Sequence, residues 1–398
     1  MTSADFNNDG YLDFTVTHGG GFTIYYNNGT GGFTAQIFPT SGKMLDSLCS
    51  GDFNHDGYVD LLYSYSLTDP GQYKYLYGIV GLLLNQGPSG FSNETIIYRT
   101  AAGDRIHPHL VSADFNRDGN PDFIVGDNSG KVELYLGDGH GSFTSAGIIH
   151  DWGQVSWGLA TGDMNHDGAA DFLVWCDQHG HSPVYLKYNN QKQGRYFSHT
   201  QGTPFFDFGI IGSLAALDYN GDGNIDLFVV QGGLVMLYIN QDGIFYPFQV
   251  LILPNNDGLY MGGLAVGDFN NDGRMDVVTG GNNGVVRVFY NNQEQPTGVA
   301  ITSPLEHHLT INGEARAVPI LWRTVVIGNT TTIKVKTFGD VVRVDFFVNG
   351  ALKSIDTEPP FEWEWSGHGT STYDLQVIGY DSQGNRMSDY LTVTRIAL

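Results

Sequence analysis

The sequence predicts an all-β protein, a six-bladed β-propeller followed by a small β-sandwich. A nine-residue phrase of the form D-x-N-x-D-G-x-x-D occurs six times, starting at residues 5, 52, 114, 163, 218 and 268. A short run of β-branched and aromatic residues follows each copy, as expected for a strand. No part of the chain shows the 3.6-residue apolar period of a helix.

The repeat length favours propeller blades among the β folds. Successive copies are 47, 62, 49, 55 and 50 residues apart, the length of one four-stranded blade. In the first repeat we expect strands at 2–6, 13–17, 22–27 and 33–38, and the sixth repeat shows no clear fourth strand. Six phrases predict six blades; a seventh, degenerate blade is the alternative, although the sequence shows no room for it. A β-sandwich array is the main rival, but a phrase at one fixed place in every repeat favours blades.

The phrase has the chemistry of a cation-binding loop. Positions 1, 5 and 9 are Asp and position 3 is Asn in all six copies. Oxygen-only, largely anionic ligands suit Ca²⁺ rather than Zn²⁺. Position 6 is always Gly, as a sharp turn with positive φ requires. A plain turn rich in Asp, Asn and Gly would explain one copy, but not six.

The remaining positions complete the prediction of about six bound Ca²⁺. Position 7 varies widely, as expected if only its carbonyl is used, and the large apolar position 2 is expected to point into the core. An EF-hand loop would place its last acid at position 12 between helices, whereas here it is at position 9 before a strand. The predicted ligands, at positions 1, 3, 5, 7 and 9, are Asp5, Asn7, Asp9, Tyr11, Asp13, Asp52, Asn54, Asp56, Tyr58, Asp60, Asp114, Asn116, Asp118, Asn120, Asp122, Asp163, Asn165, Asp167, Ala169, Asp171, Asp218, Asn220, Asp222, Asn224, Asp226, Asp268, Asn270, Asp272, Arg274 and Asp276.

The loops also explain the net charge of −23, because they contain eighteen of the 42 acidic residues. Six Ca²⁺ would remove about half of it. Basic patches and runs of Lys or Arg do not occur, so nucleic acid and anionic membranes are not expected as partners. No apolar run is long enough for a transmembrane helix.

The phrase, its spacing and the strand after it resemble the FG-GAP/VCBS repeat family, which also forms the calcium-bearing blades of integrin α-subunit heads. The resemblance covers about residues 1–295. It implies a β-propeller with calcium in the loop between the first two strands of each blade. The family spans adhesins, lectins and non-catalytic parts of enzymes, so the resemblance specifies the fold better than the role.

A polar stretch at 294–297 looks like a linker, which divides the chain into domains 1–295 and 296–398. About seven strand runs follow it, at 298–302, 324–327, 331–337, 341–348, 361–365, 373–380 and 390–396. The stretches 344–350, 356–365 and 378–381 resemble bacterial and archaeal Ig-like domains. Without a cysteine pair, the core should form around Trp363 or Trp365.

Three further sets of residues are candidate sites. Insertions at 67–78, with Tyr73, Tyr75 and Tyr77, and at 177–182, with His179 and His181, could bind sugars or a metal. Tyrosines packed on a blade edge and a solvated loop are the simpler interpretations. Glycosylation sequons occur at Asn28, Asn93 and Asn329. Cys49 and Cys176 are expected to be two buried thiols rather than a disulfide.

These patterns favour a non-enzymatic, extracellular calcium-binding surface protein for adhesion or for surface or filament assembly. Such loops saturate at extracellular calcium levels, so we expect a signal peptide to have been removed or trimmed. No nucleophile elbow, H-E-x-x-H motif or phosphate-binding loop occurs. The partners would be a protein or glycan of a cell surface or matrix, or further copies of the chain. The rivals are a lectin-like carbohydrate-binding protein, an accessory propeller of a polysaccharide-degrading enzyme, and a polysaccharide lyase.

Overall fold

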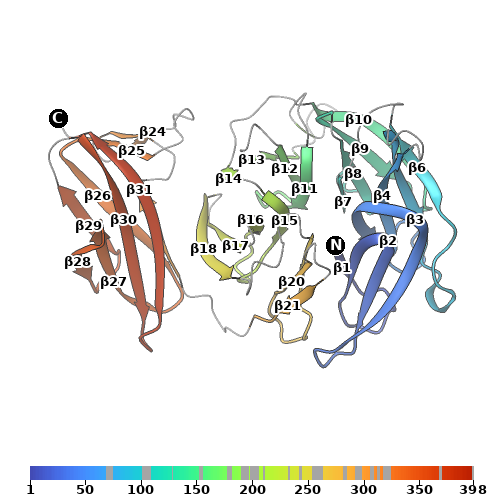
Figure 1. Cartoon of the computed structure of the whole chain (residues 1–398), viewed down its shortest axis with the longest axis horizontal. Coiled ribbons are helices and arrows are strands. Elements are labelled where there is room, and N and C mark those ends of the chain that lie inside the picture. The colour runs from blue at the N-terminus through green and yellow to red at the C-terminus, as the bar shows by residue number, and fades with distance from the viewer. Residues whose placement is uncertain are drawn as a thin grey trace. The chain divides into compact units, whose positions relative to one another are not determined.

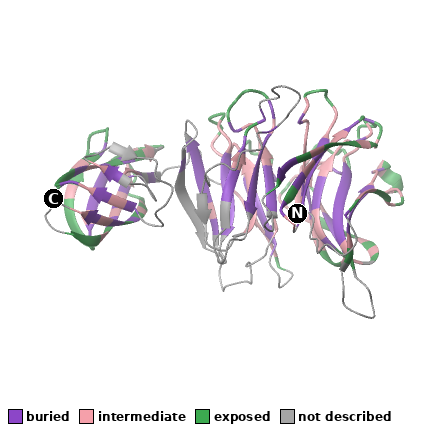
Figure 2. Ribbon diagram, turned by 90° about the horizontal axis from the view of Figure 1, so that it is seen from above, coloured by how far each residue is buried: buried purple, intermediate pink, exposed green. Residues whose placement is uncertain are grey.

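The structure is a computed structural model of the whole chain, shown in Figure 1. It describes residues 1–68, 75–100, 109–127, 129–151, 156–176, 182–189, 197, 206–208, 211–231, 234–241, 244–252, 263–280, 285–291, 298–304, 309–311, 314–316, 324–366 and 370–396. Apart from the 3₁₀ turn η1 (Gly87–Ser89), the regular structure of these residues is β-strand, which confirms the predicted all-β class. Buried residues concentrate on the strands and exposed ones on the connections (Figure 2).

The described strands of the repeats form six antiparallel sheets, one around each phrase, with strands in chain order from one edge to the other. The first two are joined through β3 (Phe33–Gly51), one half of which pairs with β2 and the other with β4. The first holds β1 (Thr2–Ala4), β2 (Asp13–Asn27) and the start of β3, and the second holds the end of β3, β4 (Asp60–Thr68), β5 (Tyr75–Leu83) and β6 (Thr95–Arg99).

The later sheets are separate. The third sheet holds β7 (His109–Ala113), β8 (Asp122–Gly126), β9 (Lys131–Gly137) and β10 (Phe143–Asp151), and the fourth holds β11 (Ser156–Gly162), β12 (Asp171–Cys176), β13 (Ser182–Lys187) and β14 (Phe206–Phe208). The fifth sheet holds β15 (Ile211–Leu217), β16 (Asp226–Gln231), β17 (Leu234–Gln241) and β18 (Ile244–Ile252). The sixth sheet holds β19 (Gly263–Gly267), β20 (Asp276–Gly280) and β21 (Val286–Phe289). Among the described residues the sixth sheet has three strands, as its sequence suggested.

Two predicted strands of the first repeat are merged in β2, which folds back on itself. Phe14 and Tyr25 lie eleven residues apart in this strand, yet their rings stack with centroids 4.8 Å apart. In the third sheet Phe123 of β8 and Tyr135 of β9 stack in the same way at 4.9 Å. The two halves of β2 therefore correspond to the second and third strands of the other repeats.

The first strands of the six sheets lie next to one another in cyclic order. β3, β7, β11, β15 and β19 each contact the first strand of the preceding sheet, and β1 contacts β19. Apolar clusters fill the spaces between sheets, one of which joins Phe14 of the first repeat with Ala265, Phe269 and Val278 of the sixth. The first repeat is thus packed against the last, although no single sheet is closed.

The chain divides into two compact units, Met1–Val235 with Leu251–Asn292, and Met236–Val250 with Gln293–Leu398. The predicted domain boundary at residue 295 lies outside the described residues.

The C-terminal region contains two sheets. One has the order β22 (Gly298–Ser303), β26 (Thr330–Phe338) and β29 (Glu362–Ser366). The other has the order β24 (Glu314–Arg316), β23 (Leu309–Ile311), β25 (Thr324–Ile327), β31 (Arg386–Ile396), β30 (Thr370–Asp381), β27 (Val341–Val348) and β28 (Ala351–Asp356). β23, β24 and β28 were missed by the sequence analysis.

One apolar cluster joins both C-terminal sheets and includes Val299, Phe346, Trp365 and Val393. Of the two predicted core tryptophans, Trp365 is 5% exposed, and Trp363 packs against the cluster from its margin. No helix among the described residues is long and apolar enough to cross a membrane.

Candidate metal-binding loops

Each of the six phrases connects the first two strands of its sheet. The residue before position 1 pairs with the Asp at position 9, as in Ala4 with Asp13 and Gly51 with Asp60. The same pairing closes the other four loops. The prediction that each phrase is a hairpin connection leading into a strand is confirmed.

The loop backbone shows why these residue types are needed. The glycine at position 6 has a φ between 81° and 90° in all six loops, in the left-handed region that favours glycine. Position 4 also has a positive φ in all six, from 55° to 72°, which the sequence analysis missed. The residues there are Asn8, His55, Arg117, His166, Gly221 and Asn271. Asn, His and Gly are enriched in this region, so the signal was present in the sequence.

The side chains at positions 1, 3 and 5 turn inward onto the loop backbone. In the first loop the Asp9 amide donates to both Asp5 Oδ1 and Asn7 Oδ1 at 3.1 Å. The Gly10 amide donates to Asp5 Oδ2 at 2.8 Å, and Asn7 Nδ2 donates to Asp9 Oδ2 at 2.9 Å. The same pattern recurs in the other five loops. Oxygen atoms of positions 1 and 3 therefore converge on one backbone amide.

The Asp at position 9 is fully buried in every loop. Asp13 accepts hydrogen bonds from the Phe6 amide at 3.0 Å and the Asn27 amide at 2.8 Å. Burial raises the pKa of Asp13 to about 6, because it disfavours the charged form more than these hydrogen bonds favour it. The pKa values of Asp60, Asp122 and Asp171 are raised to about 6 for the same reason.

The donor set of each loop fits Ca²⁺ in its chemistry. The side chains at positions 1, 3, 5 and 9 all offer oxygen acceptors, the Asn amide nitrogen being a donor only, and position 7 offers a carbonyl oxygen. In the described residues, no three acidic, histidine or cysteine side chains are gathered as a ready metal group. The Asn nitrogen at position 3 instead donates to the carboxylate at position 5.

In three repeats an asparagine at or just after the end of the third strand forms a hydrogen bond to the loop of the preceding repeat, a contact that the sequence did not predict. Asn85 Nδ2 donates to the Phe6 carbonyl at 2.8 Å, and Asn189 Nδ2 to the Phe115 carbonyl at 2.7 Å. Asn27 Nδ2 donates to the Phe269 carbonyl at 2.7 Å, which joins the first repeat to the sixth. Asn240 and Asn291 stand at the matching places of the last two repeats. This recurring Asn was the available signal.

The third repeat departs from this pattern for a steric reason. Gly137 occupies the place of the asparagine, and a Cβ atom there would lie 2.3 Å from the Pro121 carbonyl oxygen. The Phe53 carbonyl of the preceding loop is bound instead by the Gly141 amide at 2.8 Å.

The loops differ at position 7. Arg274 in the sixth loop contacts its own position-5 carboxylate, with Nη2 at 2.5 Å from Asp272 Oδ2. Its Nε donates to the Asn291 carbonyl at 2.7 Å. The proposed calcium ligand Asp272 is therefore already paired with the positively charged side chain of Arg274 in this loop.

The structure describes only part of the two predicted insertion loops. Tyr73, His179 and His181 lie outside the described residues, and only the backbone of Tyr75 is described. Tyr75 and Tyr77 belong to β5 and pair with Thr68 and Leu67, so this part of the predicted insertion loop is a longer hairpin. Tyr77 packs at the margin of the cluster between the first two sheets, under the Arg99 guanidinium at 5.1 Å.

The asparagines of the three sequons, Asn28, Asn93 and Asn329, are exposed, whereas Cys49 is buried. Asn28 Oδ1 accepts from the Thr30 and Gly32 amides, so this sequon lies in a closed turn. Cys49 is a buried free thiol whose pKa burial raises to about 12, as expected for a packing residue.

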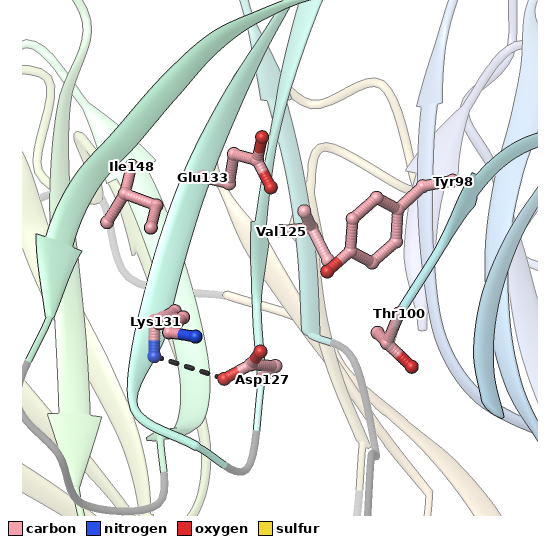
Figure 3. A pocket seen from close by; sticks show the side chains of 7 residues that line it. All are labelled: Tyr98, Thr100, Val125, Asp127, Lys131, Glu133 and Ile148. Atoms are coloured by element: carbon pink, nitrogen blue, oxygen red, sulfur yellow. Dashed lines mark hydrogen bonds between the residues drawn. The ribbon is translucent and has the colours of Figure 1, made fainter. Parts of the chain in front are cut away.

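A cavity of about 180 Å³ opens between β6 of the second sheet and β8–β10 of the third (Figure 3). Tyr98 lies on one side of it, and its ring meets Tyr135 edge to face at 5.6 Å. Asp127 lies opposite, with Oδ1 accepting from the Lys131 amide at 3.0 Å. The lining residues are Tyr98, Thr100, Val125, Asp127, Lys131, Glu133 and Ile148.

A second polar cluster lies between the first two sheets. The Lys43 ammonium forms an ion pair with Glu94 and lies 4.5 Å from the ring centroid of Tyr65. Burial alone would raise the pKa of the Glu94 carboxyl, but hydrogen bonds from Lys43 and Tyr63 outweigh it and lower that pKa. Burial likewise opposes the charge on Lys43, but its interactions with Glu94 and Tyr65 outweigh burial and raise its pKa.

Comparison with known protein families identifies two kinds of module. Residues 5–63, 114–174 and 218–279 match the FG-GAP-like repeat, and residues 323–377 match the bacterial Ig domain. Each of the three repeat matches contains two of the six phrases. Both resemblances expected from the sequence are thus confirmed. No functionally curated protein matches the chain.

Solved structures give weaker likenesses. Fibronectin(III)-like modules of Clostridium thermocellum CbhA are 26% identical over 20% of this chain and 93% of theirs, with a TM-score of 0.17. The BBS1N chain, in complex with ARL6DN, is 12% identical over 73% of this chain and 78% of its own, at 0.41.

A third likeness is to the extracellular domain of a hybrid two component system from B. thetaiotaomicron. It is 13% identical and covers 100% of this chain, with a TM-score of 0.37, and this chain spans 55% of its length. Because every TM-score lies below 0.5, these likenesses assign no function.

Proposed function

We propose that this chain of FG-GAP-like repeats and a bacterial Ig domain is a non-enzymatic, extracellular calcium-binding surface protein that mediates adhesion or surface assembly. The observation that carries the proposal is the recurrence of one loop geometry six times, each with oxygen side chains facing a shared backbone turn. Structural calcium in such loops would leave the exposed surface of a rigid scaffold for partner binding.

The six sheets would be the blades of a propeller. Two observations support this propeller arrangement: the first strands of neighbouring sheets contact one another in cyclic order, and the first and sixth repeats share an apolar cluster. The hydrogen bond from Asn27 to the Phe269 carbonyl would close the ring between residues 242 positions apart.

Calcium would supply the positive charge that holds each loop closed. Three carboxylates within nine residues repel one another, and a bound divalent cation would turn this repulsion into attraction. Binding would exchange the side-chain hydrogen bond between Asn7 and Asp9, and its equivalents in the other loops, for coordination by oxygen. The remaining backbone hydrogen bonds would keep the ligands of positions 1 and 5 in place.

Metal stoichiometry tests the calcium part of the proposal. Equilibrium dialysis of the purified chain in about 2 mM calcium, near the range of extracellular calcium modules, should give about six ions per chain. Asp118→Asn, at a ligand position, should lower that number by one, whereas Asp374→Asn in the C-terminal sheet should not. A chain that retains no calcium would overturn the proposal.

The adhesion part needs a binding assay with a calcium arm and a chelator arm. The folded chain would be applied to a broad glycan array and to immobilised cell-surface and matrix proteins. Saturable, chelator-sensitive binding to protein, or self-association, supports adhesion or assembly. Turnover of a polysaccharide in the same samples would favour an enzyme.

Carbohydrate binding is the second candidate function, and the cavity between the second and third sheets favours it. An aromatic ring and carboxylates around a space of this size suit a single pyranose, with ring stacking and acceptors for its hydroxyls. Tyr98→Ala should abolish binding to the glycan array, whereas Tyr390→Ala, at an exposed tyrosine of β31, should not. Equal binding by both variants would exclude this cavity.

A further inference from the structure

The side chain at position 4 of a loop reaches the next loop along the chain. Asn8 Nδ2 of the first loop donates to the Gly57 carbonyl of the second at 2.8 Å. His55 Nε2 of the second loop donates to Asn120 Oδ1 of the third, also at 2.8 Å. Both partners belong to positions 6 and 7, the turn that carries the proposed carbonyl ligand.

The third and fourth loops are each linked to the next loop in the same way, so that the linked loops form a row. Arg117 Nη2 donates to the backbone carbonyl and to Oδ1 of Asp167 at 2.6 and 2.9 Å. His166 Nε2 of the fourth loop donates to Asn224 Oδ1 of the fifth at 2.9 Å. Four consecutive pairs of loops are therefore joined by one side chain each, always from position 4 to positions 5–7 of the next loop.

The row ends at the fifth loop, where position 4 is Gly221 and has no side chain to donate. The positive φ at position 4 explains why glycine can stand there without strain. In the sixth loop Asn271 makes no such hydrogen bond within the part of the chain that the structure describes.

We propose that loops 1 to 5 form one coupled metal-binding row, in which the position-4 side chains are positioning residues for the loop that follows. This inference rests on the calcium-binding role proposed above. A cation that orders one loop fixes its position-4 side chain, and that side chain then holds the metal-binding turn of the next loop. The second loop has less conformational freedom to lose when it binds, which is positive coupling between sites. The sixth loop would bind independently.

Calcium titration of loop-specific variants tests the coupling. Asn8→Gly, His55→Gly and His166→Gly combined remove three links while keeping a residue that accepts positive φ. Hydrogen exchange of the backbone amides reports each loop separately.

In the wild type, loops 1 to 5 should become protected together, with a Hill coefficient above unity. In the triple variant cooperativity should fall and be confined to loops 3 and 4, which Arg117 still joins. The midpoints of loops 2, 3 and 5 should rise about twofold to tenfold, the range expected for one hydrogen bond. Asn271→Gly is the matched control and should leave every midpoint unchanged.

These measurements distinguish a failure of the coupling from a failure of the calcium-binding proposal itself. A triple variant that binds calcium with wild-type midpoints and cooperativity would overturn the coupling and leave the calcium sites intact. A wild-type chain without calcium-dependent protection in any loop would overturn the proposed function and the coupling with it.

Discussion

Each repeat sheet buries a carboxylate at the start of its second strand, whereas the C-terminal sheets bury an arginine. Asp13 and its five equivalents are 0% exposed, and Arg395 is 1% exposed. The guanidinium of Arg395 lies 4.5 Å from the ring centroid of Trp365 and donates to the Asn329 carbonyl. Burial lowers the pKa of Arg395, as it raises that of the buried carboxylates, so each region keeps a charged group that burial opposes.

The two regions differ in the interactions that stabilise them against the cost of burying these charged groups. The repeats gather three aspartates in each of six loops and spread their apolar contacts over several clusters between sheets. The C-terminal sheets share one continuous apolar cluster. The stability of the repeats should therefore depend on supplied cations, and that of the Ig-like sheets on side-chain packing.

Removal of calcium should have the largest effect, and only on the repeats. With dissociation constants of about 0.1–1 mM, each loop would gain about 0.6–2 kcal/mol at 2 mM calcium, or about 4–11 kcal/mol for six loops. In calorimetry, EDTA should lower the repeat transition by more than about 10 °C and leave the Ig-like transition in place. Identical melts with EDTA and with calcium would refute the six-site assignment.

Trp365→Ala should produce the opposite result. This side chain is 5% exposed within the C-terminal cluster, and truncation of a buried tryptophan costs about 3–5 kcal/mol. The Ig-like transition should fall or disappear while the repeat transition stays. Trp363→Ala, at the margin of the cluster, should cost clearly less, and equal losses would contradict the assigned core.

Asn85→Ala should weaken the repeats even when calcium is present. Its Nδ2 serves the Phe6 and Val59 carbonyls, and an unpaired buried backbone group costs about 1–3 kcal/mol. Chemical denaturation should show a loss of about that size in the repeat transition. Asn93→Ala, at an exposed position, is the control. No difference between the two would show that the ties between repeats are dispensable.

The sequence was most informative where one local rule recurs. The loop positions, the positive φ of the position-6 glycines and the strand after each position-9 aspartate follow from short-range chemistry repeated six times. The ties made by Asn27, Asn85 and Asn189 were missed because their partners are 74 to 242 residues away, although the asparagine itself recurs.

Other errors have equally local causes. The merging of two predicted strands in β2 depends on a hairpin through consecutive glycines, which the sequence analysis treated as a break. β28 was missed because Leu352 and Ile355 are about half exposed, so its pattern lacks a buried face. The tyrosines of β5 were assigned to an insertion loop because the hairpin that contains them extends beyond the length typical of the other repeats.

Lys43→Met should change how repeat stability depends on pH. The lowered pKa of Glu94 means that its contribution is present above its ordinary value of 4.5 and is lost as the pH falls through the folded value. The variant leaves Glu94 without its cation, at a cost of about 1–3 kcal/mol near neutral pH. Since Glu94 then favours protonation, the variant should approach the wild type in stability as the pH falls. A constant difference from neutral pH to pH 4 would contradict the ion pair's role.

Arg274→Ala should have the smallest effect, confined to the sixth loop and opposite in sign. The guanidinium lies against Asp272, a proposed calcium ligand, and a partly exposed pair of this kind is worth at most about 1 kcal/mol. Its removal should increase calcium affinity at this loop about two- to fivefold, because the carboxylate no longer has to leave a cation before it binds another. Loop-resolved hydrogen exchange during a calcium titration would measure the midpoint of 268–276, with Arg386→Ala in β31 as the charge-matched control. A lower affinity would mean that Arg274 holds Asp272 in its binding position rather than competing for it, and the sixth loop would then resemble the fourth, where Arg117 contacts Asp167 from the neighbouring loop.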